Sequence, residues 1–141
     1  MLESQLFRIR VEVFPAAARP VYRQTSRYWW PDGREFELVY DADFDAAADR
    51  IVIDTDRMTG SCRAIDEDVL YIEFGFRATP GQRVGEMIQL SRDGRHRART
   101  WHWYEDEQLV RLTLVHERRT SLDPADWPAT HVRPEGFAFE A

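Results

Sequence analysis

The stretch that decides the fold is VGEMIQLSRDGRHRARTWHW, residues 84–103. Apolar and polar residues alternate on both sides of Asp93-Gly94, and this alternation is typical of half-buried β-strands. An Asp-Gly pair between two such runs favours a two-residue hairpin turn. The stretch therefore predicts an antiparallel hairpin in which Glu86 lies opposite Trp101.

The same alternation recurs along most of the chain, and helical periodicity is almost absent. It predicts nine strands, at residues 6–14, 21–30, 35–40, 50–55, 59–65, 69–76, 83–91, 95–104 and 108–119. Their spacing and tight connections favour one all-β domain, an antiparallel up-and-down β-barrel of eight or nine strands over residues 1–121. A β-sandwich is the alternative. Residues 122–141 are expected to form a short helical turn after Asp123 and a tail that packs on the barrel, with Phe137 and Phe139 in a short strand.

Composition excludes several classes of function. The 141 residues carry 25 acidic and 19 basic side chains, and the formal net charge of −6 argues against binding nucleic acid along a basic face. Every basic residue is Arg, so Schiff-base chemistry on a lysine is excluded. The sequence has no long apolar run that could span a membrane and no apolar signal-peptide core, so we expect a cytoplasmic protein without a membrane partner.

Hairpin geometry carries charged residues onto the apolar face of the predicted sheet. A two-residue turn at 106–107 would pair the strand expected at residues 108–119 with residues 97–103. The two hairpins then place their apolar residues on the same face of the sheet. The apolar residues of that face are Val84, Ile88, Leu90, Trp101, Trp103, Val110, Leu112 and Leu114. The charged or titratable residues carried with them are Glu86, Arg97, Arg99 and His116. A third hairpin, at Asp32-Gly33, would set Trp29 against Phe36, Arg27 against Leu38 and Thr25 against Tyr40, which directs Arg27 inward as well.

The inward charges need compensating partners, because burying an unpaired guanidinium is costly. One interpretation is an internal ion-pair network that joins Glu86 to Arg97 or Arg99. The other is a polar floor in an aromatic cavity that receives a small anionic ligand. A single β-bulge would turn every later side chain to the opposite face and change these assignments.

Three short motifs resemble those of a known family. They are Gly85-Glu86, residues 95–100 (RHRART) and residues 112–119 (LTLVHERR). They resemble a Glu before a hairpin, an Arg-x-Arg-Thr strand and a Ser-Glu-x-Arg-like strand end in S-type, lipocalin-like phycobiliprotein bilin lyases and in a related uncharacterised lipocalin-like group. The matching positions are Glu86, Arg97, Arg99, Thr100, Glu117 and Arg119, and residues 23–27 (RQTSR) resemble a further segment. The resemblance implies a calycin barrel whose inward Arg residues meet the carboxylates of a bound tetrapyrrole.

The expected function is carrier-like or chaperone-like binding of a small amphipathic anion, for which a tetrapyrrole or another conjugated molecule is a candidate. No cofactor is required, although a bilin or another hydrophobic anion would fit this expectation. The expected ligand-binding residues are Arg27, Trp29, Tyr40, Glu86, Arg97, Arg99, Trp101, Trp103 and His116. The alternative is a small barrel isomerase, cyclase or lyase in which Glu86 and His116 act as general acid and base, so enzymatic activity stays open.

No metal site is expected. The hairpins place His96 and His102 on the outer face, roughly 20 Å apart along one strand at ~3.3 Å per residue, while His116 points inward, so no chelating pair emerges. The single cysteine, Cys62, cannot form an intrachain disulfide and is expected to be a buried, inert thiol. A homodimer remains open.

Overall fold

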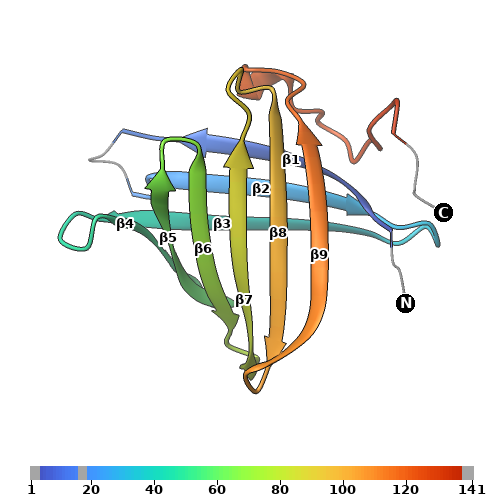
Figure 1. Cartoon of the computed structure of the whole chain (residues 1–141). Helices are drawn as coiled ribbons and strands as arrows, with labels where there is room; N and C mark the ends of the chain where they lie inside the picture. The colour runs from blue at the N-terminus through green and yellow to red at the C-terminus, as the bar shows by residue number, and fades with distance from the viewer. Residues whose placement is uncertain (1–3, 16–18, 138–141) are drawn as a thin grey trace. The chain divides into compact units, whose positions relative to one another are not determined.

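The computed structural model describes residues 4–15 and 19–137. Figure 1 shows the nine strands that these residues form. They are β1 (Leu6–Val13), β2 (Tyr22–Trp29), β3 (Glu35–Asp45), β4 (Arg50–Asp54), β5 (Met58–Asp66), β6 (Val69–Phe76), β7 (Thr79–Leu90), β8 (His96–Glu105) and β9 (Gln108–Arg118). Each strand lies beside the next one in the sequence, in the order β1 to β9. This meander confirms the predicted all-β, antiparallel fold.

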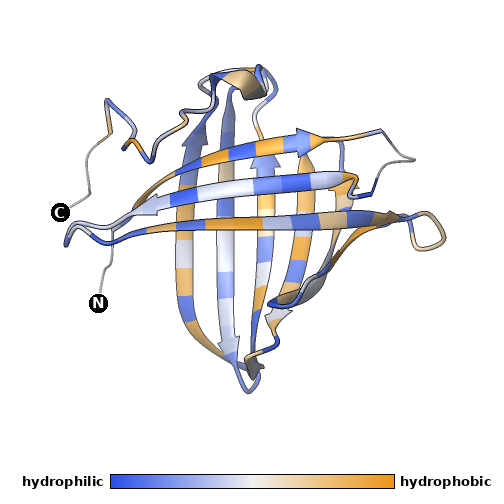
Figure 2. Cartoon of the chain, turned by 180° about the vertical axis from the view of Figure 1, so that it is seen from behind, coloured by the Kyte–Doolittle hydropathy of each residue, from blue (hydrophilic) through white to orange (hydrophobic). Residues whose placement is uncertain are grey.

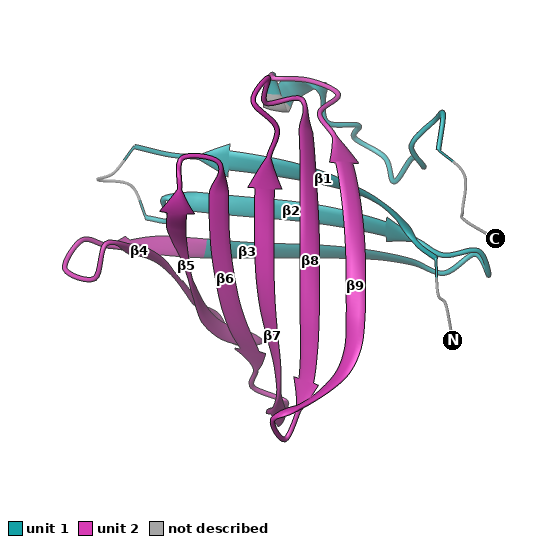
Figure 3. Ribbon diagram, viewed as in Figure 1, with its two compact units in different colours: residues 1–41, 123–141 teal, residues 42–122 magenta. Residues whose placement is uncertain are grey.

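The chain divides into two compact units, which Figure 3 colours separately. Unit 1 comprises residues 1–41 and 123–141, and it holds β1, β2 and the first part of β3. Unit 2 comprises residues 42–122, and it holds the end of β3 and β4 to β9. Closure of the sheet into a lipocalin-like barrel, and its folding as a single domain, stay predictions.

The C-terminal segment contains little regular structure. Pro124–Asp126 form one 3-10 turn of three residues, and no α-helix occurs in the residues described. Phe137 is not in a strand, contrary to the prediction, and Phe139 lies outside the described residues. The described part of the chain also has no helix of the length and apolarity needed to cross a membrane.

One face of the unit 2 sheet is buried. Side chains alternate between the two faces of a strand, and Figure 2 shows the hydropathy changing along the strands accordingly. The most buried residues of β4 to β9 that share this face are Ile53, Met58, Cys62, Ile72, Val84, Glu86, Ile88, Arg99 and Val115. We call it the buried face. The fully buried Val84 lies between Phe74 and Trp103 of the neighbouring strands, so apolar packing there holds β6, β7 and β8 together.

The β7–β8 hairpin has the predicted register, with Glu86 opposite Trp101 and Leu90 opposite Arg97. The predicted two-residue turn is not formed. The N–H of Ser91 donates to the carbonyl of His96 (2.9 Å) and that of Gly94 to the carbonyl of Ser91 (2.8 Å), so residues 92–95 form a four-residue loop, with Gly94 at φ 64°. The side chains that the sequence assigns to the apolar face of this hairpin therefore share one face in the structure.

The β8–β9 hairpin keeps the predicted register only beside its turn, because a β-bulge between Trp103 and Tyr104 shifts the pairing by one residue. Beyond the bulge, Arg99 lies opposite Val115 and Arg97 lies opposite Glu117. The prediction that Val110, Leu112, Leu114 and His116 lie on the apolar face is therefore wrong. Leu114 is 74% exposed, whereas Val115 is buried.

The β2–β3 hairpin also differs from the prediction by one residue. The backbone N–H of Trp30 donates to the carbonyl of Arg34 (3.0 Å), so the loop has three residues and not two. The contacts follow this longer loop: Tyr28 lies against Phe36, Arg27 pairs with Glu37, and Tyr40 reaches Gln24. The predicted pairs Trp29–Phe36, Arg27–Leu38 and Thr25–Tyr40 are corrected accordingly.

Candidate functional site

Four charged side chains form a chain of ion pairs on the buried face of unit 2. Arg99 donates through Nε to Glu86 and through Nη1 to Glu117 (2.9 Å). Arg97 donates through Nε to the other oxygen of Glu117. Only 2% of Glu86 and 5% of Arg99 are exposed. The inward charges therefore neutralise one another, as the ion-pair interpretation of the sequence requires, and Glu117 is a partner that it did not include.

The electrostatics of this network keep Arg99 charged. Burial by itself would lower the pKa of the guanidinium, but the carboxylates of Glu86 and Glu117 raise it above its ordinary value. A buried cation with two carboxylate partners depends on both of them, because few other groups compensate its lost hydration.

An aromatic cluster, formed by Phe74, Phe76, Trp101 and Trp103, lies on the same face. The ring of Phe76 stacks on that of Trp103 at 6.2 Å between centroids, and Trp103 meets Trp101 edge-on at 5.9 Å. Phe74 contacts Phe76 edge-on at 5.6 Å. All four rings are only partly buried, so the cluster retains surface that a ligand could cover.

Polar and charged side chains contact the rings of this cluster. The guanidinium of Arg111 lies 4.0 Å from the ring centre of Trp103, and Arg99 lies 5.0 Å from that of Trp101. Trp103 Nε1 donates to Thr113 Oγ1 (3.0 Å). Trp101 Nε1, by contrast, is buried without an acceptor among the described residues. Buried donors normally have partners, so this nitrogen is a donor that the described residues leave unsatisfied.

The sequence prediction missed several residues of this face, namely Phe74, Phe76, Arg111, Thr113 and Glu117. The last three reach it only because of the β-bulge. The signal in the sequence is the apolar pair Leu109-Val110, which interrupts the alternation at the start of β9.

His116 lies on the opposite face of the sheet, which corrects its predicted inward position. Its Nε2 lies 3.2 Å from Nδ1 of His96, and the two rings stack at 5.3 Å between centroids. Glu86 is on the buried face, paired with Arg99. The two residues proposed as general acid and base are thus separated by the sheet, and the enzymatic alternative loses its catalytic pair.

The remaining predicted site residues, Arg27, Trp29 and Tyr40, lie in unit 1. Arg27 donates through Nη1 to the carbonyls of Pro128 (2.8 Å) and Thr130 (2.7 Å). Its guanidinium also lies 4.7 Å from the ring centre of Trp127, and Glu37 accepts from its Nε. The inward Arg27 therefore binds the C-terminal segment of its own chain.

Trp29 and Tyr40 are also engaged within unit 1. The ring of Trp29 meets that of His131 edge-on at 4.6 Å, and the hydroxyl of Tyr40 donates to Gln24 (3.1 Å). Because these residues serve the packing of unit 1, the candidate site is restricted to the buried face of unit 2.

Cys62, on the buried face of β5, is expected to react slowly. Burial, with a smaller contribution from Glu86, raises the pKa of its thiol from 9.0 to about 11. Iodoacetamide should therefore modify native protein far more slowly than unfolded protein at pH 8, with the rate rising towards pH 11. The unfolded thiol ionises at lower pH, so the stability associated with the neutral thiol should decline between pH 9 and about 11. Equal rates of labelling of native and urea-unfolded protein at pH 8 would contradict a buried Cys62 thiol with a raised pKa.

Comparison of the chain with family models, curated proteins and solved structures finds no match. The likeness to lipocalin-like bilin lyases therefore stays an expectation that rests on the short motifs of β7 to β9. Any function must be argued from the aromatic cluster and the charges that surround it.

Proposed function

We propose that unit 2 binds a small amphipathic anion against its aromatic cluster, as part of a lipocalin-like binding barrel. The observation that carries the proposal is the combination, on one sheet face, of four partly exposed aromatic rings and an indole N–H that finds no acceptor in the described part of the chain. Ligand sites of proteins combine apolar area with a few fixed polar groups in this way.

The charge balance supports an anionic ligand. Three guanidinium groups, of Arg97, Arg99 and Arg111, share the face with two carboxylates, of Glu86 and Glu117, which leaves one positive charge in excess. Arg97 and Arg99 are already paired with carboxylates. Arg111 has no carboxylate partner among the described residues, and its guanidinium lies over the Trp103 ring, so we assign the recognition of the anionic group to Arg111.

The rings account for the apolar part of the ligand. A flat, conjugated body can stack on Trp101 and Trp103, and its burial would supply most of the binding free energy. A carboxylate or another acceptor oxygen that reaches Trp101 Nε1 would supply the acceptor that this buried donor lacks among the described residues.

Titration with 1-pyrenebutyrate, an aromatic carboxylate, tests the proposal. Excitation of the tryptophans should produce sensitised pyrene emission that saturates. Arg111→Met should weaken the binding of the acid about fivefold, because an exposed ion pair contributes at most ~1 kcal/mol. The neutral amide, 1-pyrenebutanamide, should bind equally to the wild type and the variant.

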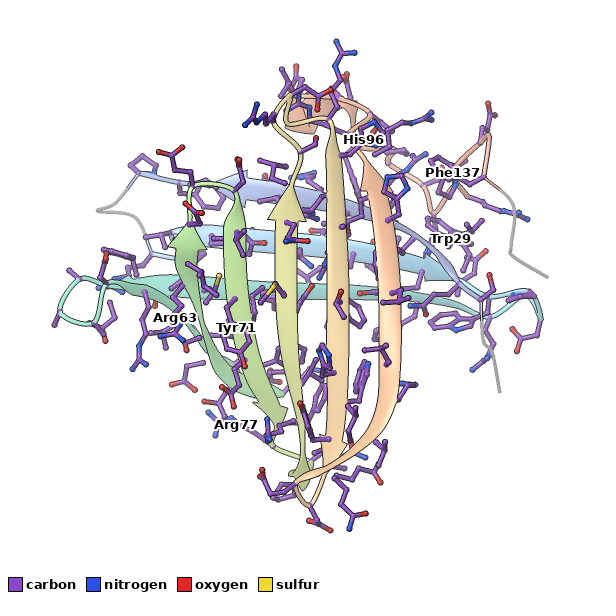
Figure 4. The ribbon with its side chains drawn as sticks, viewed as in Figure 1. Trp29, Arg63, Tyr71, Arg77, His96 and Phe137 are labelled. Carbon is purple, nitrogen blue, oxygen red and sulfur yellow. The ribbon has the colours of Figure 1, made fainter. Side chains whose placement is uncertain are left out.

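Arg63→Met is the matched control. Arg63 also lies over an aromatic ring, that of Tyr71 at 5.8 Å, but on the opposite face of the sheet, and Figure 4 labels both residues. The control should leave binding of the acid unchanged. Absence of saturable emission, or equal losses of acid and amide binding in Arg111→Met, would overturn the proposal.

The narrower expectation of a bilin or another conjugated ligand has a separate test. Freshly purified protein should then absorb visible light, and denaturation should release the pigment for mass spectrometry. Colourless protein that still binds 1-pyrenebutyrate would support the general proposal and contradict the narrower one.

A further inference from the structure

The two polar groups of the aromatic cluster that are open to a ligand partner differ in charge and in burial. Arg111 is a cation on an exposed side chain, whereas Trp101 Nε1 is an uncharged donor and is buried. They belong to the same face of the sheet, because Arg111 lies opposite Trp103 and Thr113 lies opposite Trp101 in the β8–β9 ladder. A ligand that contacts both groups therefore meets a different kind of polar partner at each of its ends.

The distances within the cluster limit how far apart these two groups lie. The guanidinium carbon of Arg111 is 4.0 Å from the ring centre of Trp103, which is 5.9 Å from the ring centre of Trp101. The two distances, 4.0 and 5.9 Å, set an upper limit of about 10 Å between the guanidinium carbon and the centre of the Trp101 ring. A small fused-ring ligand is long enough to connect the two groups.

The charges beside Trp101 balance one another. The guanidinium of Arg99 lies 5.0 Å from the centre of the Trp101 ring. Glu86 and Glu117 accept hydrogen bonds from Arg99, and Glu117 also accepts one from Arg97. The positive and negative charges of this network are equal in number, so it offers no net attraction to an anionic group. Moving a carboxylate to a buried position without a cation of its own is costly, whereas an uncharged carbonyl oxygen loses much less hydration.

The second indole of the cluster differs from Trp101 in its hydrogen bonding. Trp103 Nε1 donates to Thr113 Oγ1 (3.0 Å), so the protein satisfies this donor. Trp101 Nε1 has no acceptor among the residues that the structure describes. A ligand acceptor is therefore expected to bind at Trp101 and not at Trp103.

We propose that the ligand of the aromatic cluster is a fused-ring aromatic acid with a second, uncharged acceptor such as a ring ketone, which binds Trp101 Nε1 while Arg111 binds the anion. This inference rests on the proposed function and narrows the class of ligand. A buried donor without a partner is unfavourable, so supplying an acceptor to Trp101 improves binding more than contacting a donor that is already bound. The two polar contacts together would fix the orientation of the ligand on the rings.

Two acids of nearly the same shape test this inference, 9-fluorenone-2-carboxylate and fluorene-2-carboxylate, which differ in the ketone oxygen. Calorimetric titration of the full-length protein should show the ketone binding about fivefold to tenfold more tightly, because it alone supplies an acceptor to the buried donor. Trp101→Phe, which keeps an aromatic ring and removes the N–H, should abolish this preference. Trp103→Phe is the matched control and should keep the preference while weakening the binding of both acids.

The indole N–H signals in NMR spectra give a second readout that needs no variant to fold. Saturation with the fluorenone acid should shift the Nε1–H signal of Trp101 downfield, and the fluorene acid should not. The Nε1–H signal of Trp103, which is bound to Thr113, should respond equally to the two acids.

The outcomes separate this inference from the proposed function. Equal affinities of the two acids for the wild type, or a preference for the ketone that survives in Trp101→Phe, would overturn the inference and leave the proposed function intact. If neither acid nor 1-pyrenebutyrate binds, the proposed function is overturned and this inference with it.

Discussion

Replacing Glu86 by Gln is expected to lower the free energy of unfolding by about 3–5 kcal/mol, the usual cost of removing one partner of a buried ion pair. The substitution keeps the shape of the side chain and removes its charge. Arg99, which is 5% exposed, would then retain only Glu117, and Glu117 also serves Arg97. Most domains are stable by only about 5–15 kcal/mol, so urea denaturation should show a large loss.

Two further variants separate the ion pair from general packing. Arg97 is more exposed, and Arg97→Met leaves Arg99 with both carboxylates, so its cost should stay below about 1 kcal/mol. The double variant Glu86→Leu/Arg99→Met replaces both charges by apolar groups and should recover much of the stability lost in Glu86→Gln. A loss in Glu86→Gln no larger than that in Arg97→Met would show that Glu86 does not compensate Arg99.

The β7–β8 hairpin illustrates what the sequence can predict. The Asp93-Gly94 pair predicts a two-residue turn, whereas the structure has a four-residue loop, residues 92–95, between Ser91 and His96. A two-residue and a four-residue loop centred on the same position give the same register, so the predicted pairing of the ladder is confirmed. The apolar alternation on both strands agrees with that register. Because both loop lengths give the pairing that the hydrophobic pattern favours, the shared face of Glu86, Arg99 and Trp101 follows from the sequence.

The other two hairpins have pairings that their turn residues do not predict. Pro31, Asp32 and Gly33 form a three-residue loop with Gly33 at φ 86°, a common alternative to the two-residue turn that the Asp-Gly pair suggests. In the β8–β9 hairpin the tip is as predicted, with Asp106 and Glu107 both at positive φ. The bulge lies between Trp103 and Tyr104, outside the two turn residues, so the turn sequence does not specify it.

This one-residue shift also explains the outcome for the candidate site. The alternation of side chains along β7 and β8 predicts that Glu86, Arg97 and Arg99 lie on the face that carries the aromatic rings, and the observed register agrees. In β9 the bulge reverses the predicted alternation, so Glu117 and not His116 lies on that face. Glu86 therefore belongs to an ion-pair network with Arg99, Glu117 and Arg97 and has no acid–base partner in His116, because a single inserted residue decides which side of a strand faces the core.

Replacing Gly60 by Ala is expected to lower the free energy of unfolding by about 1–3 kcal/mol, because β5 and β6 approach each other closely at this residue. Gly60 is the ladder partner of Phe74 on the buried face. A Cβ there would lie 2.6 Å from the Cβ and 2.7 Å from the Cα of Phe74, and it would also collide with the carbonyl oxygen of Glu73. Backbone atoms cannot move aside as a flexible side chain can, so β5 and β6 would have to separate.

Gly75, on β6, provides the matched control, because a Cβ at that position would meet only the carbonyl oxygen of Gln82, at 3.4 Å. Its φ lies outside the left-handed region, so alanine fits the backbone, and the loss of chain entropy on folding becomes smaller. Gly75→Ala should therefore raise the free energy of unfolding by about 0.4–1 kcal/mol while Gly60→Ala lowers it. Urea denaturation of the two variants measures both changes in the free energy of unfolding, one expected to be negative and the other positive. Equal effects at the two positions would mean that β5 and β6 do not approach as closely at Gly60 as the structure indicates.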